Sequence, residues 1–394
     1  MKIIIAGGGI AGLASALSLA GQGHHITLLE QAAAFGEVGA GLQISPNGMR
    51  VISALGLEDE LRAVAFEPTR IELRFGESGQ VIFDVPLSDR AMDRWGAPYL
   101  HVHRADLLDV LVKAAEAHDA IDVRFGSRVQ SWNSMLNQVE VHLNHGEICR
   151  ADVLIGADGI HSIVREQMLG PDVPRFTGCI AWRGVVEMEK LQDHPPPPTA
   201  CAWVGKGKHA VTYQLRCGKL ANIVGVVERS DWRQESWSEA GTKAAFLEDF
   251  EGWHPTITNM IGQGDDYFRW ALFDRAPLRR WAQGRVALIG DAAHPMLPFV
   301  AQGAVMALED AWMLGRCLNR YAHDVPDALK TYEAKRHARA THVQRLSSQN
   351  KTTFHHRNPM TRLSTYGPMW LAGHILPELV HQRFDWIYGY DVTA

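Results

Sequence analysis

Residues 2–12, Lys-Ile-Ile-Ile-Ala-Gly-Gly-Gly-Ile-Ala-Gly, place a short apolar strand directly before a glycine turn, and residues 13–20 continue in a helical pattern. In such a strand–turn–helix unit, Gly9 lets a pyrophosphate approach the backbone and Gly12 lets the helix lie close to the strand. The first amides of the helix, including that of Ala11, supply N–H donors for the phosphates. The stretch therefore predicts a dinucleotide-binding α/β domain.

An acidic residue follows at the expected distance. A second apolar strand, residues 25–29, ends at Glu30, which lies 18 residues after Gly12. A carboxylate at this place hydrogen-bonds ribose hydroxyls and repels a 2′-phosphate. We therefore expect the tightly bound dinucleotide to be FAD or NAD rather than NADP.

The composition is that of a globular protein with room for two or three domains, because 46% of the 394 residues are hydrophobic. The net charge of −5 gives no basic field, so neither nucleic acid nor an anionic membrane is an expected partner. We expect no membrane span and no signal peptide, and hence a cytoplasmic protein. The five cysteines form no CxxC pair and the histidines have no metal-ligand spacing, so no metal site is expected.

Strand and helix signals alternate in the first part of the chain and again near the end, whereas residues 176–228 carry successive β-branched and aromatic runs typical of an antiparallel sheet. The predicted fold is α/β, a Rossmann-like domain with an inserted antiparallel β-sheet domain and C-terminal helices. The expected boundaries are residues 1–70, 96–172 and 275–349 for the first domain, 71–95 and 173–274 for the inserted domain, and 350–394 for the C-terminal helical segment.

Three separated segments carry a family resemblance: residues 7–12, residues 156–165 (Gly-Ala-Asp-Gly-Ile-His-Ser-Ile-Val-Arg) and residues 290–295 (Gly-Asp-Ala-Ala-His-Pro). In this order they resemble the group A flavin-dependent aromatic hydroxylases, the family of p-hydroxybenzoate and salicylate hydroxylases, over roughly residues 1–345. The resemblance implies the p-hydroxybenzoate hydroxylase-like fold and a bound FAD. It also implies NADH or NADPH as a transient co-substrate, and O2 that reacts through a C4a-hydroperoxyflavin to hydroxylate an aromatic ring.

The resemblance assigns FAD contacts to particular residues. Asp291, after a buried strand, is placed to accept hydrogen bonds from the ribityl chain. A helix that begins at Gly303 and Ala304 would direct its N–H groups at the flavin's pyrimidine carbonyls and stabilise the negative charge of the reduced flavin. Arg104 would pair with an FAD phosphate or ribose, with a surface salt bridge as the alternative. The other expected contacts are Val129, Asp158 (alternatively a turn residue that binds backbone N–H groups), and Gln43 and Ser45 near the isoalloxazine edge.

His209 and Tyr213 lie four residues apart on an expected strand, so their side chains should face the same side. Activation of a phenolic ring needs a base that removes the hydroxyl proton near working pH, which suits histidine. The His-x-x-x-Tyr pattern resembles salicylate, 3-hydroxybenzoate 6- and 6-hydroxynicotinate hydroxylases. We therefore predict His209 as the base with Tyr213 beside it. The alternative is a buried pair satisfied within the sheet.

Further substrate contacts are expected around the ring and its carboxylate. Pro298 and Phe299 resemble the family's loop beside the flavin. Arg183 and Arg216 are both candidates to bind a carboxylate, and an ion pair at the domain junction would explain either one equally well. Cys201, on the strand before His209, is either a substrate contact or a small packing residue.

The prediction is an FAD-dependent monooxygenase acting on a small phenolic acid, with a salicylate-like or 3-hydroxybenzoate-like substrate favoured. One alternative is a hydroxypyridine carboxylate such as 6-hydroxynicotinate, although its hydroxylases are expected to have a histidine near the position of Gln43. Others are a flavin-dependent reductase or dehydrogenase, and a flavin-bound sensor. The apolar segment 368–376 is expected to lie against the body of the protein, and residues from 350 onward to cap the fold or form a homodimer contact.

Overall fold

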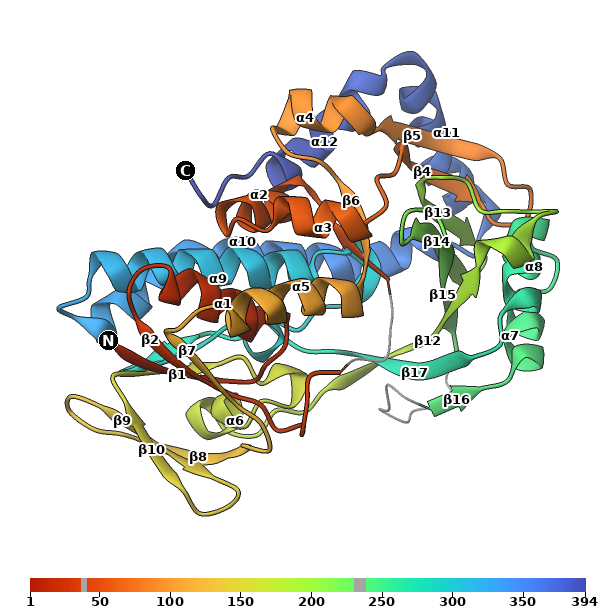
Figure 1. Cartoon of the computed structure of the whole chain (residues 1–394). Helices are drawn as coiled ribbons and strands as arrows, with labels where there is room; N and C mark the ends of the chain where they lie inside the picture. Colours follow the sequence, from red (N-terminus) through yellow and green to blue (C-terminus); the bar gives the residue numbers. More distant parts are fainter. Residues whose placement is uncertain (37–40, 230–238) are drawn as a thin grey trace.

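A six-stranded sheet forms the centre of the nucleotide-binding half in the computed structural model, which describes residues 1–36, 41–229 and 239–394 (Figure 1). The strand order is β18-β19-β11-β1-β2-β7, and all neighbours except β18 and β19 run parallel. The carboxyl ends of the parallel strands therefore meet at one edge, where ligands bind in open α/β sheets. The strands are β1 (Lys2–Ala6), β2 (His25–Leu29), β7 (Ile121–Arg124), β11 (Val153–Gly156), β18 (Ala282–Gln283) and β19 (Val286–Leu288).

Helices cover one side of this sheet, and a three-stranded meander lies on the other (Figure 1). The apolar residues of β1 and of α1 are buried together in one core. The covering helices are α1 (Ile10–Ala20), α5 (Arg104–Glu116), α9 (Gly303–Arg320) and α10 (Val325–Phe354). The meander consists of β8 (Val129–Ser134), β9 (Val139–Leu143) and β10 (Ile148–Ala151), and α6 (Ile163–Leu169) follows β11.

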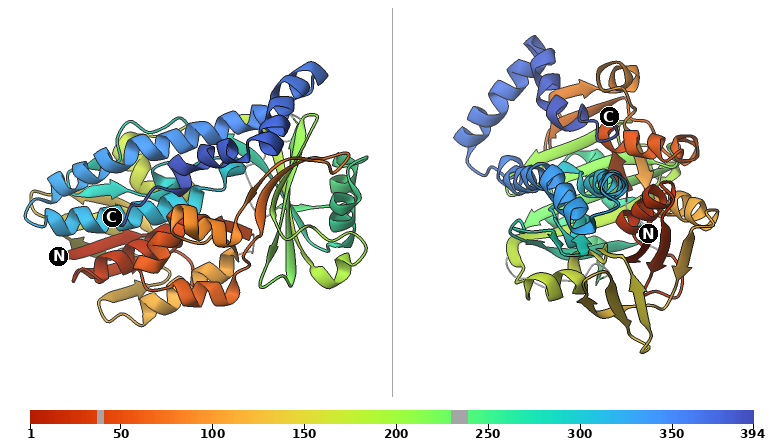
Figure 2. Two further views of the ribbon diagram at one scale, coloured as in Figure 1. Left: turned by 90° about the horizontal axis from the view of Figure 1, so that it is seen from above. Right: turned by 90° about the vertical axis from the view of Figure 1, so that its left-hand side faces the viewer.

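An eight-stranded sheet builds the second half of the molecule (Figure 2). Its order is β16-β17-β12-β15-β14-β13-β4-β5, antiparallel except between β13 and β4. One face is buried beneath α7 (Lys243–Asp249) and α8 (Pro255–Gln263), and the other faces the nucleotide-binding half. The strands are β4 (Arg70–Phe75), β5 (Val81–Pro86), β12 (Arg175–Glu187), β13 (Ala200–Gly205), β14 (Lys208–Leu215), β15 (Leu220–Glu228), β16 (Glu239–Gly241) and β17 (Tyr267–Asp274).

Short elements join the two halves. A two-stranded sheet pairs β3 with β6, and α2 begins directly after β3 with Ser45 as its N-cap residue. These elements bring the segment after the first βαβ unit to the junction of the two large sheets. Their bounds are β3 (Gly41–Ile44), α2 (Pro46–Ala54), α3 (Glu58–Val64), α4 (Ser88–Trp95) and β6 (Leu100–His103).

The C-terminal segment differs from the prediction in where its helices begin and end. The boundary expected between residues 349 and 350 falls inside α10, because no proline or glycine follows Pro326 of the first turn before the helix ends at Phe354. The apolar segment 368–376 lies mostly within α11 (Pro359–Ile375), which tolerates Pro368 and is followed by α12 (Pro377–Tyr388). Only one side of α11 packs on the body, and the other is exposed. Among the described residues, no helix is long and apolar enough to cross a membrane.

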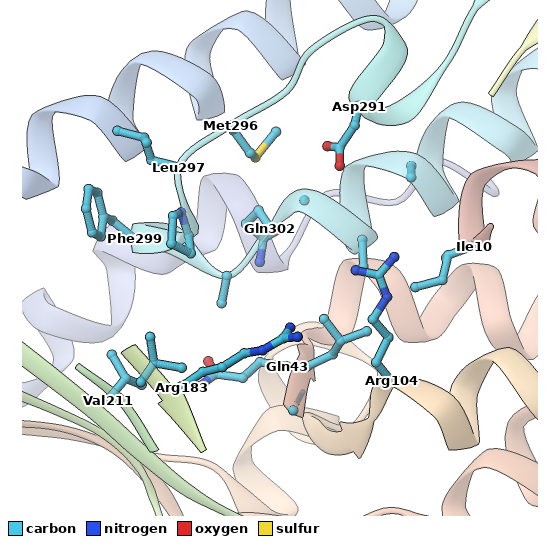
Figure 3. A pocket seen from close by; sticks show the side chains of 18 of the residues that line it. Ile10, Gln43, Arg104, Arg183, Val211, Asp291, Met296, Leu297, Phe299 and Gln302 are labelled. Carbon is cyan, nitrogen blue, oxygen red and sulfur yellow. The ribbon is translucent and has the colours of Figure 1, made fainter. Parts of the chain in front are cut away.

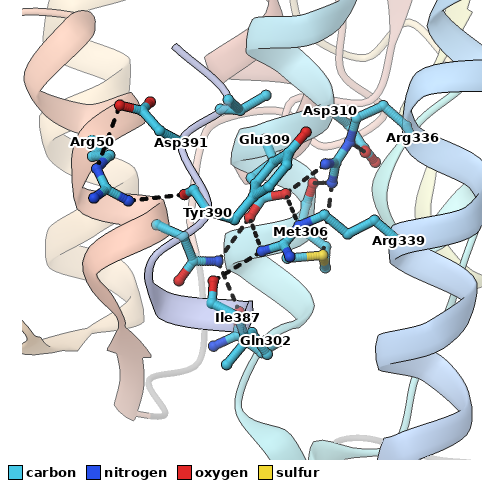
Figure 4. A network of polar contacts seen from close by, with 12 residues as sticks. Arg50, Gln302, Met306, Glu309, Asp310, Arg336, Arg339, Ile387, Tyr390 and Asp391 are labelled. Carbon is cyan, nitrogen blue, oxygen red and sulfur yellow. Dashed lines mark hydrogen bonds and ion pairs between the residues drawn. The ribbon is translucent and has the colours of Figure 1, made fainter. Parts of the chain in front are cut away.

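A buried ionic network joins α9, α10 and the C-terminal tail (Figure 4). The guanidinium of Arg336 donates to Glu309 (2.5 Å) and Asp310 (2.8 Å), and all three side chains are fully buried. Arg339 also binds Glu309 and lies 3.9 Å from the ring of Tyr390. The network holds residues 306–310 of α9 against α10, and the first residues of α9 face the site described next.

Candidate active site

The carboxyl edge of the six-stranded sheet and the inner face of the eight-stranded sheet enclose a cavity of about 330 Å³ (Figure 3). A second cleft continues from it at the carboxyl ends of β1 and β2, and Gly9, Ala157 and Gly159 line both. Together they form one elongated site. Of the predicted residues, the main cavity is lined by Gly9, Ala11, Gln43, Arg104, Arg183, His209, Tyr213, Asp291, Pro298, Phe299, Gly303 and Ala304, and the second cleft by Gly9, Glu30, Val129 and Asp158.

The glycine turn leaves room beside Gly9, where a phosphate would approach the backbone. A Cβ added to Gly9 would meet no atom within 4 Å, so the space beside this residue is open to the cavity. A Cβ on Gly12 would lie 1.9 Å from the carbonyl oxygen of Gly7, so helix and strand touch here as predicted. Because Gly9 is the N-cap residue of α1, the amides of Ile10 and Ala11 lie at the helix N-terminus beside the cavity.

Two carboxylates shape the second cleft. Glu30 accepts hydrogen bonds from the backbone N–H groups of Gly8 and Ala32, both at 2.8 Å. Asp158 accepts from the Ser162 hydroxyl at 2.5 Å, and burial raises the pKa of this carboxyl although the hydrogen bonds oppose the shift. Asp158 therefore organises its own turn and also lines the cleft, so the two interpretations of this residue are compatible.

An arginine that the sequence interpretation gave no role connects two of the family segments. The Arg165 guanidinium donates to the carbonyl oxygens of Ile160 (2.6 Å) and Ala292 (3.2 Å). It thereby holds the segment after β11 against the segment that carries Asp291. Arg104, the first residue of α5, extends into the same part of the cavity (Figure 3).

Of Gln43 and Ser45, both expected near the isoalloxazine edge, only Gln43 lines the cavity. Gln43 lines the cavity and accepts a hydrogen bond from the Tyr99 hydroxyl at 2.7 Å. Ser45 is fully buried outside it, where it donates to Asn47 (2.7 Å) and accepts from the Gln302 amide (2.8 Å). Although Ser45 is the N-cap residue of α2, its side chain makes no hydrogen bond to a backbone N–H group of that helix. Gln302, which the sequence pattern does not single out, lines the cavity instead.

His209 and Tyr213 both line the cavity from β14, with Val211 between them, as the alternation of a strand requires. Both are buried. Burial raises the pKa of the Tyr213 phenol well above its ordinary value, and burial lowers the pKa of His209 well below 6.5, with His355 lowering it further. At neutral pH the cavity therefore presents a neutral imidazole and a neutral phenol.

Two residues behind His209 were missed by the sequence interpretation. His209 Nδ1 lies 2.6 Å from Nε2 of His355, and His355 Nδ1 lies 3.3 Å from a carboxylate oxygen of Glu228. His355 follows the last turn of α10, and Glu228 ends β15. A separation of 146 residues between the histidines leaves no local sequence pattern that would join them.

Arg183 and Arg216, the two candidates to bind a carboxylate, lie in different places relative to the cavity. Arg183 lines the cavity, and its guanidinium carbon lies 5.4 and 5.5 Å from the rings of Phe268 and Trp270. Arg216 lies outside the cavity, where it binds both oxygens of Asp106 at 2.7 and 2.8 Å. Of the two, only Arg183 is placed to meet a ligand in this cavity.

Cys201 is not a contact of the cavity. It pairs with Thr212 across β13 and β14, and paired residues of adjacent strands point to the same face. Because His209, Val211 and Tyr213 line the cavity, Thr212 and Cys201 face the opposite side, where Cys201 is buried in the core beneath α7 and α8. Cys201 is therefore a small packing residue, which was the second of the two alternatives for this position.

The side chains that are present fit FAD. The open space beside Gly9 and the N-terminus of α1 suit a pyrophosphate, the second cleft offers Glu30 to a ribose, and Asp291 faces the main cavity. The N-terminus of α9 at Gly303 borders the same cavity and favours negative charge there.

Comparison with known proteins agrees with this geometry. The family described as FAD binding domain matches residues 1–347. The 6-hydroxynicotinate 3-monooxygenase of Pseudomonas fluorescens is 37% identical over 354 residues, which are 89% of this chain and 91% of that protein. The 3-hydroxybenzoate 6-hydroxylase 1 of Aquipseudomonas alcaligenes is 35% identical and covers 98% of this chain and 97% of its own.

Solved structures share the whole fold. Klebsiella pneumoniae HpxO complexed with FAD and uric acid superimposes with a TM-score of 0.86 at 27% identity, covering 97% of this chain and 95% of that one. A salicylate hydroxylase substrate complex gives a TM-score of 0.83 at 28% identity, covering 100% and 96%. The chain therefore belongs to the FAD binding domain family and is a flavoprotein aromatic monooxygenase.

Proposed function

We propose that the protein hydroxylates a small aromatic acid that carries a ring hydroxyl, with NADH or NADPH and O2 as co-substrates. The observation that carries this proposal is the presence of His209 and Arg183 in one cavity with apolar walls. The favoured substrate is similar to 3-hydroxybenzoate or salicylate.

His209 serves as the base in this proposal. Its imidazole, neutral at pH 7 because burial lowers its pKa, accepts the proton of the substrate hydroxyl at Nε2, the ring nitrogen that does not face His355. The phenolate that results is more nucleophilic than the phenol. Tyr213, whose phenol stays protonated, donates a hydrogen bond to the same substrate oxygen.

Arg183 binds the carboxylate and thereby orients the ring. A guanidinium supplies two parallel N–H donors to a carboxylate, and this one lies against aromatic rings that limit its motion. Val211, Val226 and Phe299 exclude water around the ring. FAD, when bound, supplies the redox chemistry, which is the acceptance of electrons from NAD(P)H and the activation of O2.

A hydroxypyridine carboxylate is the second candidate, because the relative named 6-hydroxynicotinate 3-monooxygenase is 37% identical over most of the chain. Gln43, which faces the cavity, is the residue at which we expected such enzymes to have a histidine. We therefore rank this substrate class below the hydroxybenzoates.

The test is oxidation of NADH and of NADPH by the purified FAD-bound protein with salicylate, 3-hydroxybenzoate and 6-hydroxynicotinate. We expect one of these acids to stimulate oxidation and to be converted to a hydroxylated product. Stimulation without product would favour a reductase, and no NAD(P)H oxidation with any acid would favour a flavin-bound sensor.

The protein is also proposed to form a homodimer through α11 and α12. These helices leave a row of large apolar side chains at the surface, which is unusual for a monomer. The members are Met360, Leu363, Trp370, Leu371, Ile375, Leu376 and Leu379.

A further inference from the structure

A line of three polar side chains runs from the cavity to the surface. It begins at His209 in the cavity wall, continues through the buried His355 at 2.6 Å and ends at Glu228 at 3.3 Å. The exposed fraction of the side chain rises from 1% at His355 to 28% at Glu228. No part of the base function proposed above requires the last two residues.

The hydrogen bonds determine which ring nitrogen of each histidine carries the proton. A carboxylate accepts only, so His355 carries its proton on Nδ1 and donates it to Glu228. His355 Nε2 is then an acceptor, and His209 must donate from Nδ1. This tautomer leaves the lone pair of His209 on Nε2, as a base in the cavity requires.

The surroundings make a charged His209 costly. The rings of Phe299 and Phe354 lie edge-on to its imidazole, each 5.2 Å away, and both histidines are buried. Burial lowers the pKa of His355 to about 4 although Glu228 raises it, and Lys351 and Arg357 lower it further. A charged imidazolium at His209 is therefore costly in this surrounding, and a proton received there is more stable once it has been passed to a group in contact with solvent.

Glu228 can receive that proton. Partial burial raises its pKa, but the nearby Arg357 and His355 outweigh burial and the net pKa is lowered. The carboxylate is therefore ionised at neutral pH, contacts solvent and loses a proton to water readily. Arg357, which binds the second carboxylate oxygen at 2.9 and 3.0 Å, holds it in place.

We propose that His355 and Glu228 form a proton relay that carries the substrate's hydroxyl proton from His209 to solvent. As Nε2 of His209 takes the proton, Nδ1 gives one to Nε2 of His355, and Nδ1 of His355 gives one to Glu228, which releases it to water. One proton enters, one leaves, and both imidazoles end neutral in the opposite tautomer, which rotation or the return of a proton restores. The relay rests on the proposed function, because it needs a substrate that loses a proton.

The experiment follows the proton itself. Oxidised holoenzyme is mixed in a stopped-flow instrument, in weakly buffered solution with a pH indicator, with 3-hydroxybenzoate, salicylate or 6-hydroxynicotinate. The variants are H355Q and E228Q, which keep side-chain size and polarity but cannot pass a proton on. The matched control is H356Q, because His356 is the adjacent histidine and contacts Thr365 at 3.1 Å away from the cavity.

We expect H355Q and E228Q to bind FAD as wild type does and to release the substrate proton at least tenfold more slowly, whereas H356Q releases it at the wild-type rate. Imidazole added to H355A should restore fast release, which a purely structural role of His355 would not produce. Wild-type rates in both H355Q and E228Q would overturn the relay alone. No proton release by wild type with any of the three acids would contradict the proposed function, and the relay with it.

Discussion

His209 is the side chain on which the proposed chemistry depends most. Replacing it with Gln removes the base but keeps the β14 strand and the glycine turn, so FAD binding should be unchanged. We expect kcat/KM for hydroxylation to fall about 10²-fold, the low end for loss of a general base, and more of the O2 consumed to appear as peroxide. Unchanged product yield and rate in H209Q would remove His209 from the mechanism.

The lowered pKa of His209 leads to a prediction about the pH dependence of kcat/KM. The base must be neutral, and the folded pKa of His209 is lowered by burial and by His355, so protonation begins only well below pH 6.5. For wild type we therefore expect kcat/KM to stay level as pH falls from 8 to 6.5 and to decline only at lower pH. A decline centred at pH 6.5 or above would contradict a buried histidine as the base.

Arg183 is predicted to recognise the substrate's carboxylate. A hydrogen bond to a charged group contributes about 1.5–3 kcal/mol, so R183Q should raise KM for the carboxylated substrate about 10- to 100-fold. A phenol without a carboxylate should be affected far less. R216Q is the matched control, because Arg216 is bound to Asp106 outside the cavity. Equal effects of R183Q on both ligands would argue for a role in packing.

In the turn between β1 and α1, Gly9 and Gly12 have different effects: Gly9 matters for cofactor binding, and Gly12 matters for folding as well. G9A should fold with a normal melting temperature, since a Cβ there meets nothing within 4 Å, but it should lose FAD affinity. G12A should lower the melting temperature as well, because its Cβ would lie 1.9 Å from the Gly7 carbonyl oxygen. Thermal unfolding of the two apoproteins and titration with FAD measure both effects, and a G12A apoprotein as stable as G9A would contradict the argument.

The α9–α10 pair depends on its buried arginine. R336M leaves Glu309 and Asp310 without their shared partner in a fully buried place, and breaking such a pair costs about 3–5 kcal/mol. Urea unfolding should show this loss. R62M is the control, because Arg62 forms only exposed ion pairs on α3, and a loss in R336M no larger than in R62M would contradict the account.

The sequence predicted the elements best where the pattern was local. The β1–turn–α1 unit and the strands β12 to β15 follow from hydrophobic runs and glycines. The contacts that pass between distant segments did not follow, as His209 with His355 and Arg165 with Ala292 illustrate. Cys201 stayed open between substrate contact and packing, and Ser45 was expected nearer the flavin, because the face of a strand and the orientation of a buried side chain depend on partners far away in the chain.

At the scale of the molecule, the C-terminal segment has two kinds of surface. The end of α12 and the tail dock on the body, where Asp385 binds Arg94 at 2.7 Å and Arg50 donates to the Tyr390 carbonyl at 2.9 Å. On α11, by contrast, Leu363 and Leu371 are 74% and 51% exposed. The sequence offered capping and dimerisation as alternatives, and the segment has surfaces suited to both.

The exposed row on α11 yields a prediction about assembly. Light scattering should give wild type the mass of two chains, and the double variant L363E/L371E the mass of one, since charges in an apolar interface oppose association. FAD content should be unchanged in the variant. A wild type with the mass of a single chain would contradict the proposed dimer.

In the proposed mechanism, one cavity holds the flavin beside a phenolic acid that His209 activates. The most direct test is the ratio of hydroxylated product to NAD(P)H oxidised, measured with salicylate, 3-hydroxybenzoate and 6-hydroxynicotinate for wild type and H209Q. For wild type we expect a ratio near one with one of the acids, and for H209Q a much lower ratio, with peroxide formed in place of the hydroxylated product. Equal ratios in the two proteins, or no product from any of the acids, would contradict this mechanism.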